Sequence, residues 1–134
     1  MKPYERTVSF EDVDAAGIVF FARYFGYCHE AMEKLFDGVA GGYVDLVTKQ
    51  KIGFPTVHLE TDFTASLRYG DVARIAATVV KVGATSCTFR YEVTRAADGV
   101  TVATVTQVVV CTKLDTLTKL PLPDDCRAAL TRRT

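Results

Sequence analysis

The sequence has 134 residues, of which 49% are apolar, and this suits one hydrophobic core rather than two, so we expect a single domain spanning residues 1–134. Its 16 basic and 16 acidic side chains cancel and are scattered along the chain, which argues against a nucleic-acid-binding surface. No stretch has the apolar run of a signal peptide or a membrane span, so we expect a cytoplasmic protein that contacts small molecules or other subunits and no membrane.

The chain begins with an alternating pattern that soon breaks. Residues 4–10 alternate as a short strand that places Val8 and Phe10 on one face. The segment around Asp14 and Gly17 interrupts this pattern, so we expect something other than regular strand there. From the residues alone, Asp14 is either a cap of the helix that follows or a functional carboxylate.

A long helix is predicted over residues 21–36, because apolar residues recur there at spacings of three and four. Asp37 and Gly38 are expected to end it, since Gly tolerates the left-handed backbone that commonly closes a helix. Residues 39–51 should hold a shorter helix or a turn. The apolar stripe consists of Phe21, Tyr24, Phe25, Cys28, Ala31, Met32, Leu35 and Phe36.

The second half of the chain is rich in β-strand patterns. Residues 56–67 alternate apolar and polar side chains, which is typical of a half-buried strand, and residues 69–71 mark the turn after it. Three further strands are predicted over residues 72–82, 86–94 and 100–111.

Short turns at Gly83-Ala84 and Asp98-Gly99 join these strands, so neighbouring strands must be antiparallel. A short polar helix should follow from about Asp124. We therefore predict an α+β fold in which a curled antiparallel sheet of about five strands wraps around one long helix.

The four cysteines lie far apart and form no Cys-x-x-Cys pair, which argues against a zinc site and a disulfide framework. Buried free thiols are expected at Cys28, Cys87, Cys111 and Cys126. His29 follows Cys28, but neighbouring helical residues point about 100° apart, so a nucleophilic thiol is disfavoured.

The order of elements and one motif resemble a known family. A strand, a long helix and four antiparallel strands are similar to the hot-dog fold. The run from Asp12 to Phe20 resembles the Asp-x-Asp-x-x-Gly-x-Val signature of the 4-hydroxybenzoyl-CoA thioesterase family. Residues 69–71 and Ser86 also match, and the likeness extends over nearly the whole chain.

The resemblance implies an acyl-CoA thioesterase whose active sites lie where two subunits meet. It also implies that Asp14 is the catalytic residue and that the backbone N–H of Phe21 holds the thioester carbonyl oxygen. Whether Asp14 attacks the carbonyl carbon or activates water stays open. We take as candidates for substrate contact Gly17, Phe20, Tyr24, His29 and Ser86.

Some candidates also have structural explanations. Gly17 is expected to permit a special backbone conformation, and Tyr24 belongs to the apolar stripe. His29 departs from the acidic residue that aromatic-acyl members carry, so it either contacts a ring substituent or packs in the core. Phe21 departs from the His that some short-chain acyl relatives carry.

Residues 83–85 lack the basic cluster that aromatic-acyl enzymes place against the CoA phosphates. The remaining candidates for phosphate contact are Arg68, Arg74, Lys81 and Arg90.

No metal and no cofactor are predicted, because Asp12 and Asp14 have no His nearby in sequence to complete a metal site and CoA is part of the substrate. Asp12 is expected to be a turn residue or a surface charge. The rings near the motif make an aromatic acyl group one candidate substrate. A non-catalytic acyl-CoA-binding protein and an acyl carrier protein thioesterase are the alternatives. A curled sheet leaves edges exposed, so we expect a homodimer or homotetramer.

Overall fold

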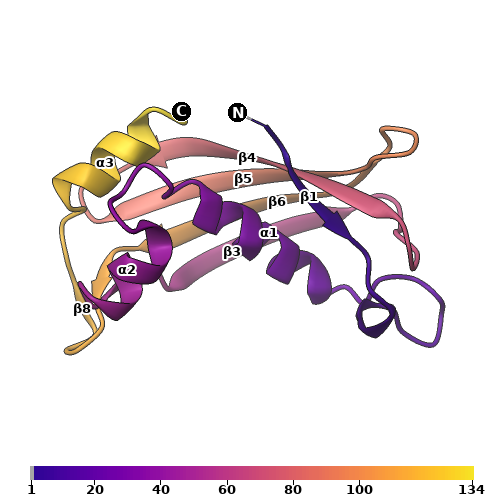
Figure 1. Ribbon diagram of the computed structural model, residues 1–134, viewed down its shortest axis with the longest axis horizontal. Helices are drawn as coiled ribbons and strands as arrows, with labels where there is room; N and C mark the ends of the chain where they lie inside the picture. Colours follow the sequence, from indigo (N-terminus) through magenta and orange to yellow (C-terminus); the bar gives the residue numbers. More distant parts are fainter. Residues whose placement is uncertain (1) are drawn as a thin grey trace.

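The structure is a computed structural model, and it describes residues 2–134 (Figure 1). In these residues a five-stranded antiparallel sheet has the order β1-β4-β5-β6-β3, and β2, β7 and β8 form a smaller sheet. Figure 1 shows α1 lying along one face of the five-stranded sheet. This arrangement confirms the predicted α+β class. The elements are β1 (Tyr4–Thr7), a 3₁₀ turn (Phe10–Asp12), α1 (Arg23–Lys34), α2 (Gly42–Thr48), β2 (Ile52–Gly53), β3 (Thr56–Phe63), β4 (Val72–Val82), β5 (Ser86–Arg95), β6 (Thr101–Val110), β7 (Thr112–Lys113), β8 (Thr118–Lys119) and α3 (Asp124–Thr131).

Helix α1 buries one stripe against the sheet, as the spacing of its apolar residues predicts. It is shorter than the predicted range of 21–36, because the chain tightens into a turn after Lys34. The N–H of Asp37 donates to the Lys34 carbonyl in this turn, at 3.2 Å. Leu35 and Phe36 are nevertheless fully buried, so they extend the core beyond the helix.

Strands β4, β5 and β6 match their predicted ranges to within one residue at each end. They pair antiparallel along their lengths. The turn at Asp98-Gly99 also forms as predicted. Gly99 has a φ of +73°, a conformation that glycine adopts without strain, and its N–H donates to the Arg95 carbonyl at 2.7 Å.

The first predicted strand, over residues 4–10, is too long. Strand β1 ends at Thr7, and the 3₁₀ turn at Phe10–Asp12 follows. The Asp12 carboxylate accepts the Ser9 N–H at 3.0 Å, which stabilises this turn. Val8 is therefore buried as expected, whereas Phe10 points outward and is 75% exposed.

Strand β3 departs most from its prediction. It covers Thr56–Phe63 rather than residues 56–67, and nearly all of its residues are exposed, so it is not half buried in the protomer. The reason is its place at the edge of the sheet, where β6 is its sheet neighbour on one side. Its apolar residues Val57 and Phe63 are 61% and 46% exposed.

The small sheet of β2, β7 and β8 was not predicted. Each of its strands has two residues, which is too short for an alternating pattern to be recognised. A Cβ at Gly53 would lie 2.8 Å from Leu114, so glycine permits the close approach of the two chain segments there.

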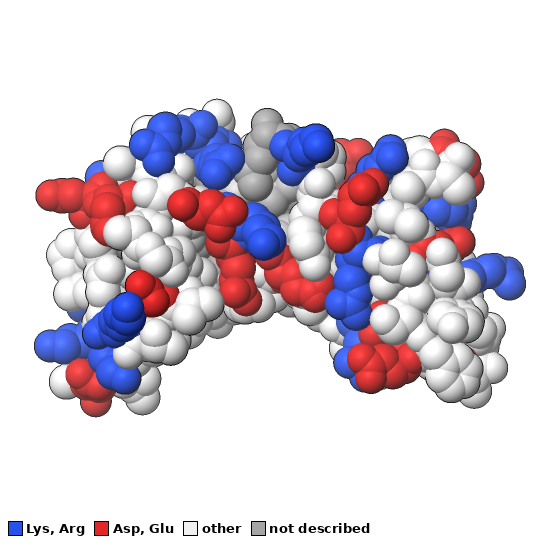
Figure 2. All heavy atoms as spheres, in the orientation of Figure 1, with Lys and Arg blue, Asp and Glu red and all other residues white. Residues whose placement is uncertain are grey.

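The surface mixes charges of both signs. On the face that Figure 2 views, Lys and Arg side chains are interspersed with Asp and Glu and with uncharged surface. None of the helices in residues 2–134 combines the length and the apolarity needed to cross a bilayer.

Candidate active site

The Asp12 to Phe20 segment forms a closed loop directly before α1. Val13 and Val19 pair as an isolated antiparallel bridge, and the N–H of Phe20 donates to the Asp12 carbonyl at 2.9 Å. Gly17 lies in the turn with a φ of +80° and donates its N–H to the Asp14 carbonyl at 2.9 Å. The expectation that Gly17 permits a special backbone conformation is therefore confirmed.

Asp14 is exposed in this loop. Its Oδ1 accepts the N–H of Ala16 at 2.9 Å, which closes a local Asx turn. Within residues 2–134, no hydrogen bond to its Oδ2 is found. Asp14 thus supports its own turn and still presents one carboxylate oxygen to solvent.

Free backbone donors lie at the start of α1. The N–H of Arg23 donates to the Phe20 carbonyl at 2.9 Å, but the N–H groups of Phe21 and Ala22 donate to no acceptor within residues 2–134. Unpaired N–H groups at a helix N-terminus carry a partial positive charge that stabilises an anion. The segment therefore joins an exposed carboxylate to free donors suited to a developing oxyanion.

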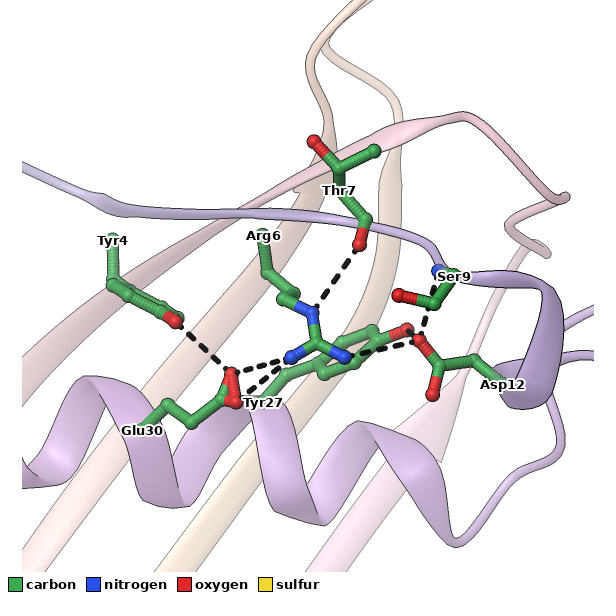
Figure 3. Close-up of polar contacts among 7 residues, drawn as sticks. All are labelled: Tyr4, Arg6, Thr7, Ser9, Asp12, Tyr27 and Glu30. Atoms are coloured by element: carbon green, nitrogen blue, oxygen red, sulfur yellow. Dashed lines mark hydrogen bonds and ion pairs between the residues drawn. The ribbon is translucent and has the colours of Figure 1, made fainter.

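Asp12 has a different environment from Asp14. It is 2% exposed, and its Oδ2 accepts hydrogen bonds from the Tyr27 hydroxyl at 2.7 Å and from the Ser9 N–H at 3.0 Å. The Arg6 guanidinium adds a third contact at 3.3 Å (Figure 3). Asp12 is thus a buried structural residue rather than a surface charge.

The contacts of Arg6 extend this network across α1. Its guanidinium lies 5.1 Å from the centre of the Tyr27 ring and bonds both oxygens of Glu30, at 3.2 and 3.1 Å. The Tyr4 hydroxyl donates to Glu30 as well, at 3.0 Å. Figure 3 shows these side chains bridging β1, the 3₁₀ turn and α1. The network therefore ties the base of the loop to the helix that follows it.

The network also shifts the acidity of its members. Burial by itself would raise the pKa of the Asp12 carboxyl, but the Tyr27 hydrogen bond, the Ser9 N–H and the Arg6 charge together lower it below its ordinary value. Burial and the contact with Asp12 raise the pKa of Tyr27. Asp12 thus stays ionised and Tyr27 protonated at neutral pH, as the hydrogen bond between them requires.

A cavity of about 230 Å³ lies between α1 and β3. The residues that matter for its chemistry are apolar Phe25, Leu59 and Val105 and polar His29, Thr56 and Gln107. Three larger hollows, of about 410, 400 and 300 Å³, are lined by other parts of the surface, including Arg132, Asp37 and Arg74. None of the three is lined by a residue of β3 or of the first turn of α1, whereas the smaller cavity is lined by Phe25, four residues after Phe21, so it is the better candidate for a site near the loop.

The aromatic candidates gather around Phe63, whose ring also lies 6.4 Å from that of Phe25 in the cavity wall. The rings of Phe20 and Phe21 lie 4.9 Å apart, and Phe63 of β3 contacts Phe21 at 6.4 Å and Tyr24 at 5.5 Å between ring centres. Phe20 and Phe21 are exposed, whereas Tyr24 is 3% exposed and belongs to the core. The core explanation of Tyr24 therefore holds, and its ring packs against that of Phe63.

His29 lies at the far end of the cavity from Phe21. Its Nε2 is 3.0 Å from Glu33 Oε2, one turn further along α1, and its side chain is half exposed. His29 therefore lies on the cavity wall rather than packed in the core. Cys28, beside it, is buried, and burial raises the pKa of its thiol to about 12. All four cysteines are buried and free, as predicted.

Ser86 is not brought near Asp14 within one protomer. The Asp14 loop lies beside the start of β4, through the bridge between Ile18 and Arg68, whereas Ser86 follows the end of that 11-residue strand. The two ends are therefore separated by about 30 Å of strand (Figure 1).

The four cation candidates are also dispersed. Arg68 lies beside the loop, and Arg74 is paired with Glu5 at 2.8 Å. Lys81 and Arg90 are exposed on β4 and β5. Among residues 2–134, no group of three His, Cys, Asp or Glu side chains is placed to hold a metal ion.

Comparison with known proteins gives the family. The model of the thioesterase-like superfamily matches residues 8–130, which is most of the chain. The chain belongs to the thioesterase-like superfamily. The predicted hot-dog fold and the prediction of a thioester hydrolase are thereby confirmed, and membership of the 4-hydroxybenzoyl-CoA thioesterase family in particular stays a prediction.

Three relatives of this thioesterase-like chain have names that state an activity. It is 38% identical over 122 residues to a 1,4-dihydroxy-2-naphthoyl-CoA hydrolase of Nostoc punctiforme, covering 91% of this chain and 81% of that protein. The solved 1,4-dihydroxy-2-naphthoyl-CoA thioesterase from Synechocystis has a TM-score of 0.86 at 28% identity, covering 97% and 95% of the two chains. A gentisyl-coenzyme A thioesterase has a TM-score of 0.84 at 28% identity, covering 94% and 99%.

Sequence reasoning missed two sets of residues in this thioesterase-like site. Arg6, Tyr27 and Glu30 hold the loop base, and Thr56 and Gln107 line the cavity. One signal was available, because Tyr27 falls near the apolar stripe of α1 and a buried hydroxyl requires a partner. Gln107, which alternates with the apolar residues Val105 and Val109 on one face of β6, was a second signal of the same kind.

Proposed function

We propose that this chain hydrolyses the thioester of an aromatic acyl-CoA, with Asp14 as its catalytic carboxylate. The observation that carries the proposal is that one short segment holds both the exposed Asp14 carboxylate and the N–H groups of Phe21 and Ala22, which donate to no acceptor within residues 2–134. A site of this kind can polarise a carbonyl group and deliver a carboxylate to it. The names of the relatives support an aromatic acyl group.

The acyl groups in those names share one chemical pattern. Both 1,4-dihydroxy-2-naphthoyl and gentisyl groups are aromatic rings that carry two hydroxyls across the ring from each other, one of them beside the acyl carbon. The cavity between α1 and β3 is lined by Phe25, whose ring contacts Phe63, and its apolar walls suit a flat group of this class. Gly17 shapes the loop, Phe20 is exposed beside Phe21, and Arg68 is the cation best placed for a CoA phosphate.

In the proposed reaction, the carbonyl oxygen accepts the N–H of Phe21 as negative charge develops on it. Asp14 either attacks the carbonyl carbon, forming a mixed anhydride that water hydrolyses after CoA has left, or takes a proton from a water that attacks the carbonyl carbon directly. The carbon–sulfur bond then breaks and CoA leaves as a thiolate, which needs little proton donation because thiol pKa values lie near 8.5. The reaction needs no cofactor, since CoA is part of the substrate.

We further propose a homodimer formed through the β3 edges. Strand β3 presents an unpaired edge and exposed apolar side chains at Val57 and Phe63, which a copy of the same edge would cover. Antiparallel pairing about a two-fold axis sets the Ser86 end of one protomer's sheet beside the Asp14 end of the other. This arrangement would let Ser86 contribute to the partner's site, and a tetramer would add a second interface.

The test of the catalytic assignment is thiol release from benzoyl-CoA, gentisyl-CoA and 1,4-dihydroxy-2-naphthoyl-CoA. We expect Asp14→Asn to lower kcat by at least about 100-fold, because the amide neither attacks nor accepts the proton. Asp14→Asn keeps the acceptor for the Ala16 N–H, so the loop should stay folded. Undiminished turnover by Asp14→Asn would refute the assignment. Binding of these esters without hydrolysis by the wild type would favour a non-catalytic binding protein instead.

A further inference from the structure

The cavity between α1 and β3 has one polar end built on β6. Gln107 Oε1 accepts the hydroxyl of Tyr91 at 2.6 Å, and Gln107 Nε2 donates to Thr56 Oγ1 at 2.7 Å. Tyr91 is fully buried, so its hydroxyl anchors the amide from behind. The amide is therefore held at the cavity wall by two contacts rather than free to rotate.

These contacts leave two hydrogen-bond donors unused in the cavity wall, one on Gln107 and one on Thr56. The Gln107 amide has two N–H groups, of which Thr56 occupies one. The Thr56 hydroxyl accepts that bond, and within residues 2–134 it donates to no other group, so its own hydrogen is available. The other walls are apolar at Phe25, Leu59 and Val105, and His29 is a further polar side chain on the α1 wall. A polar end inside an apolar slot fixes the orientation of a ligand that carries one matching polar group.

The cavity lies beside the helical face that begins at Phe21. Phe25 and His29, which line the cavity, follow Phe21 by four and eight residues, so the three lie on one face of the helical segment. They are about 6 and 12 Å along the helix axis from Phe21. An acyl group whose carbonyl oxygen accepts the Phe21 N–H would thus extend along this face and into the cavity.

We propose that Gln107 and Thr56 are specificity residues that hydrogen-bond a ring hydroxyl of the acyl group, on the side of the ring away from the thioester. The proposal rests on the proposed hydrolysis of aromatic acyl-CoA and names its preferred class, the aromatic acyl groups with a hydroxyl meta to the acyl carbon. The ring hydroxyl accepts an N–H from Gln107 or a hydrogen from Thr56 and occupies a polar end that an unsubstituted ring would leave unpaired.

The test compares two substrates that differ by this one hydroxyl, 3-hydroxybenzoyl-CoA and benzoyl-CoA. The measured quantity is the ratio of their kcat/KM values, from thiol release. We expect a ratio of about 10 or more in the wild type. Thr56→Val should lower the ratio severalfold, and Gln107→Leu should bring it close to 1.

Two further variants separate recognition from folding. Gln107→Leu leaves the buried Tyr91 hydroxyl without its partner, so Gln107→Leu combined with Tyr91→Phe provides a form without that orphan group. Thr106→Val is the matched control, because Thr106 is the neighbour of Gln107 on β6 and points to the opposite face of the sheet. Thr106→Val should keep both the ratio and the activity of the wild type.

The outcomes are distinguishable. A wild-type ratio near 1, or a ratio unchanged in the folded Gln107 and Thr56 variants, overturns the assignment of these residues and leaves the proposed hydrolysis standing. Absence of thiol release from every aromatic acyl-CoA by the wild type overturns the proposed function and this assignment with it. A ratio that falls in both variants and not in Thr106→Val supports the assignment.

Discussion

Asp12 and Asp14, two residues apart, have opposite environments. Asp12 is buried and accepts three hydrogen bonds on one oxygen, whereas Asp14 is exposed and accepts one, from within its own turn. The charge of Asp12 therefore stabilises the fold, and that of Asp14 is available for chemistry. Substitution of each should have a different main effect, on stability for Asp12 and on turnover for Asp14.

We expect Asp12→Asn to lower the free energy of unfolding at neutral pH by about 2–3 kcal/mol, because it removes a buried charge that Arg6 and Tyr27 contact. Chemical denaturation measures the change. Glu11→Gln is the matched control, since it removes a neighbouring exposed carboxylate and should change stability by less than about 0.5 kcal/mol. Equal effects of the two substitutions would contradict the role assigned to the network.

The free energy of unfolding of wild type and that of Asp12→Asn should depend differently on pH. The pKa of Asp12 is lowered on folding from its ordinary value of 3.8, so its contribution is complete above that value and is lost as the pH falls through the folded-state pKa. The stability difference between wild type and Asp12→Asn should therefore shrink between about pH 5 and pH 2. Unfolding curves across this range measure it, and a difference that stays constant would argue against the lowered pKa.

At the residue scale, sequence predicted the parts of the site that are close together in the chain. Asp14, Gly17 and Phe21 lie within eight residues, and their motif is recognisable as a unit. The contact of Asp12 with Tyr27 depends on how the helix packs after the loop. The contact of Gln107 with Thr56 depends on strand register. Neither leaves a local pattern in the sequence.

At the scale of elements, the loop and α1 impose opposite demands on glycine. Gly17 has a positive φ, where a side chain is strained, whereas Gly26 lies within α1 without a positive φ. An added Cβ meets nothing within 4 Å at either position, so the backbone alone decides the outcome.

We expect Gly17→Ala to destabilise the protein by about 1 kcal/mol and to lower turnover, because it strains the turn that carries Asp14. Gly26→Ala should instead stabilise it by about 0.5–1 kcal/mol, since Ala favours the helix. Thermal and chemical unfolding of the two variants provide the comparison. Destabilisation by Gly26→Ala would mean that this side of α1 packs against something.

Element prediction succeeded where the pattern was long. Helix α1 and strands β4, β5 and β6 have 10 or more residues each, so their periodicity is clear. The strands of the small sheet have two residues each and show none. For β3 the alternation was read correctly as strand, but its burial was not, because burial depends on what covers an edge rather than on the strand itself.

At the scale of the whole molecule, the β3 edge is the proposed dimer interface. We expect the wild type to be at least a dimer by light scattering. Val57→Arg should shift it toward the monomer, because it places a long charged side chain on the proposed interface. Val100→Arg changes an exposed valine in the β5–β6 turn and should leave the size unchanged. A monomeric wild type would refute the dimer.

The exposure of β3 has a consequence for how the molecule behaves on dilution. In the proposed dimer, a strand that buries almost none of its side chains within the protomer would gain that burial from association, so mass action would link the stability of this edge to protein concentration. The cavity beside β3 would share this dependence, because Thr56 and Leu59 form one of its walls. Specific activity would then fall as the enzyme is diluted, and a saturating ligand that binds the paired form would restore it.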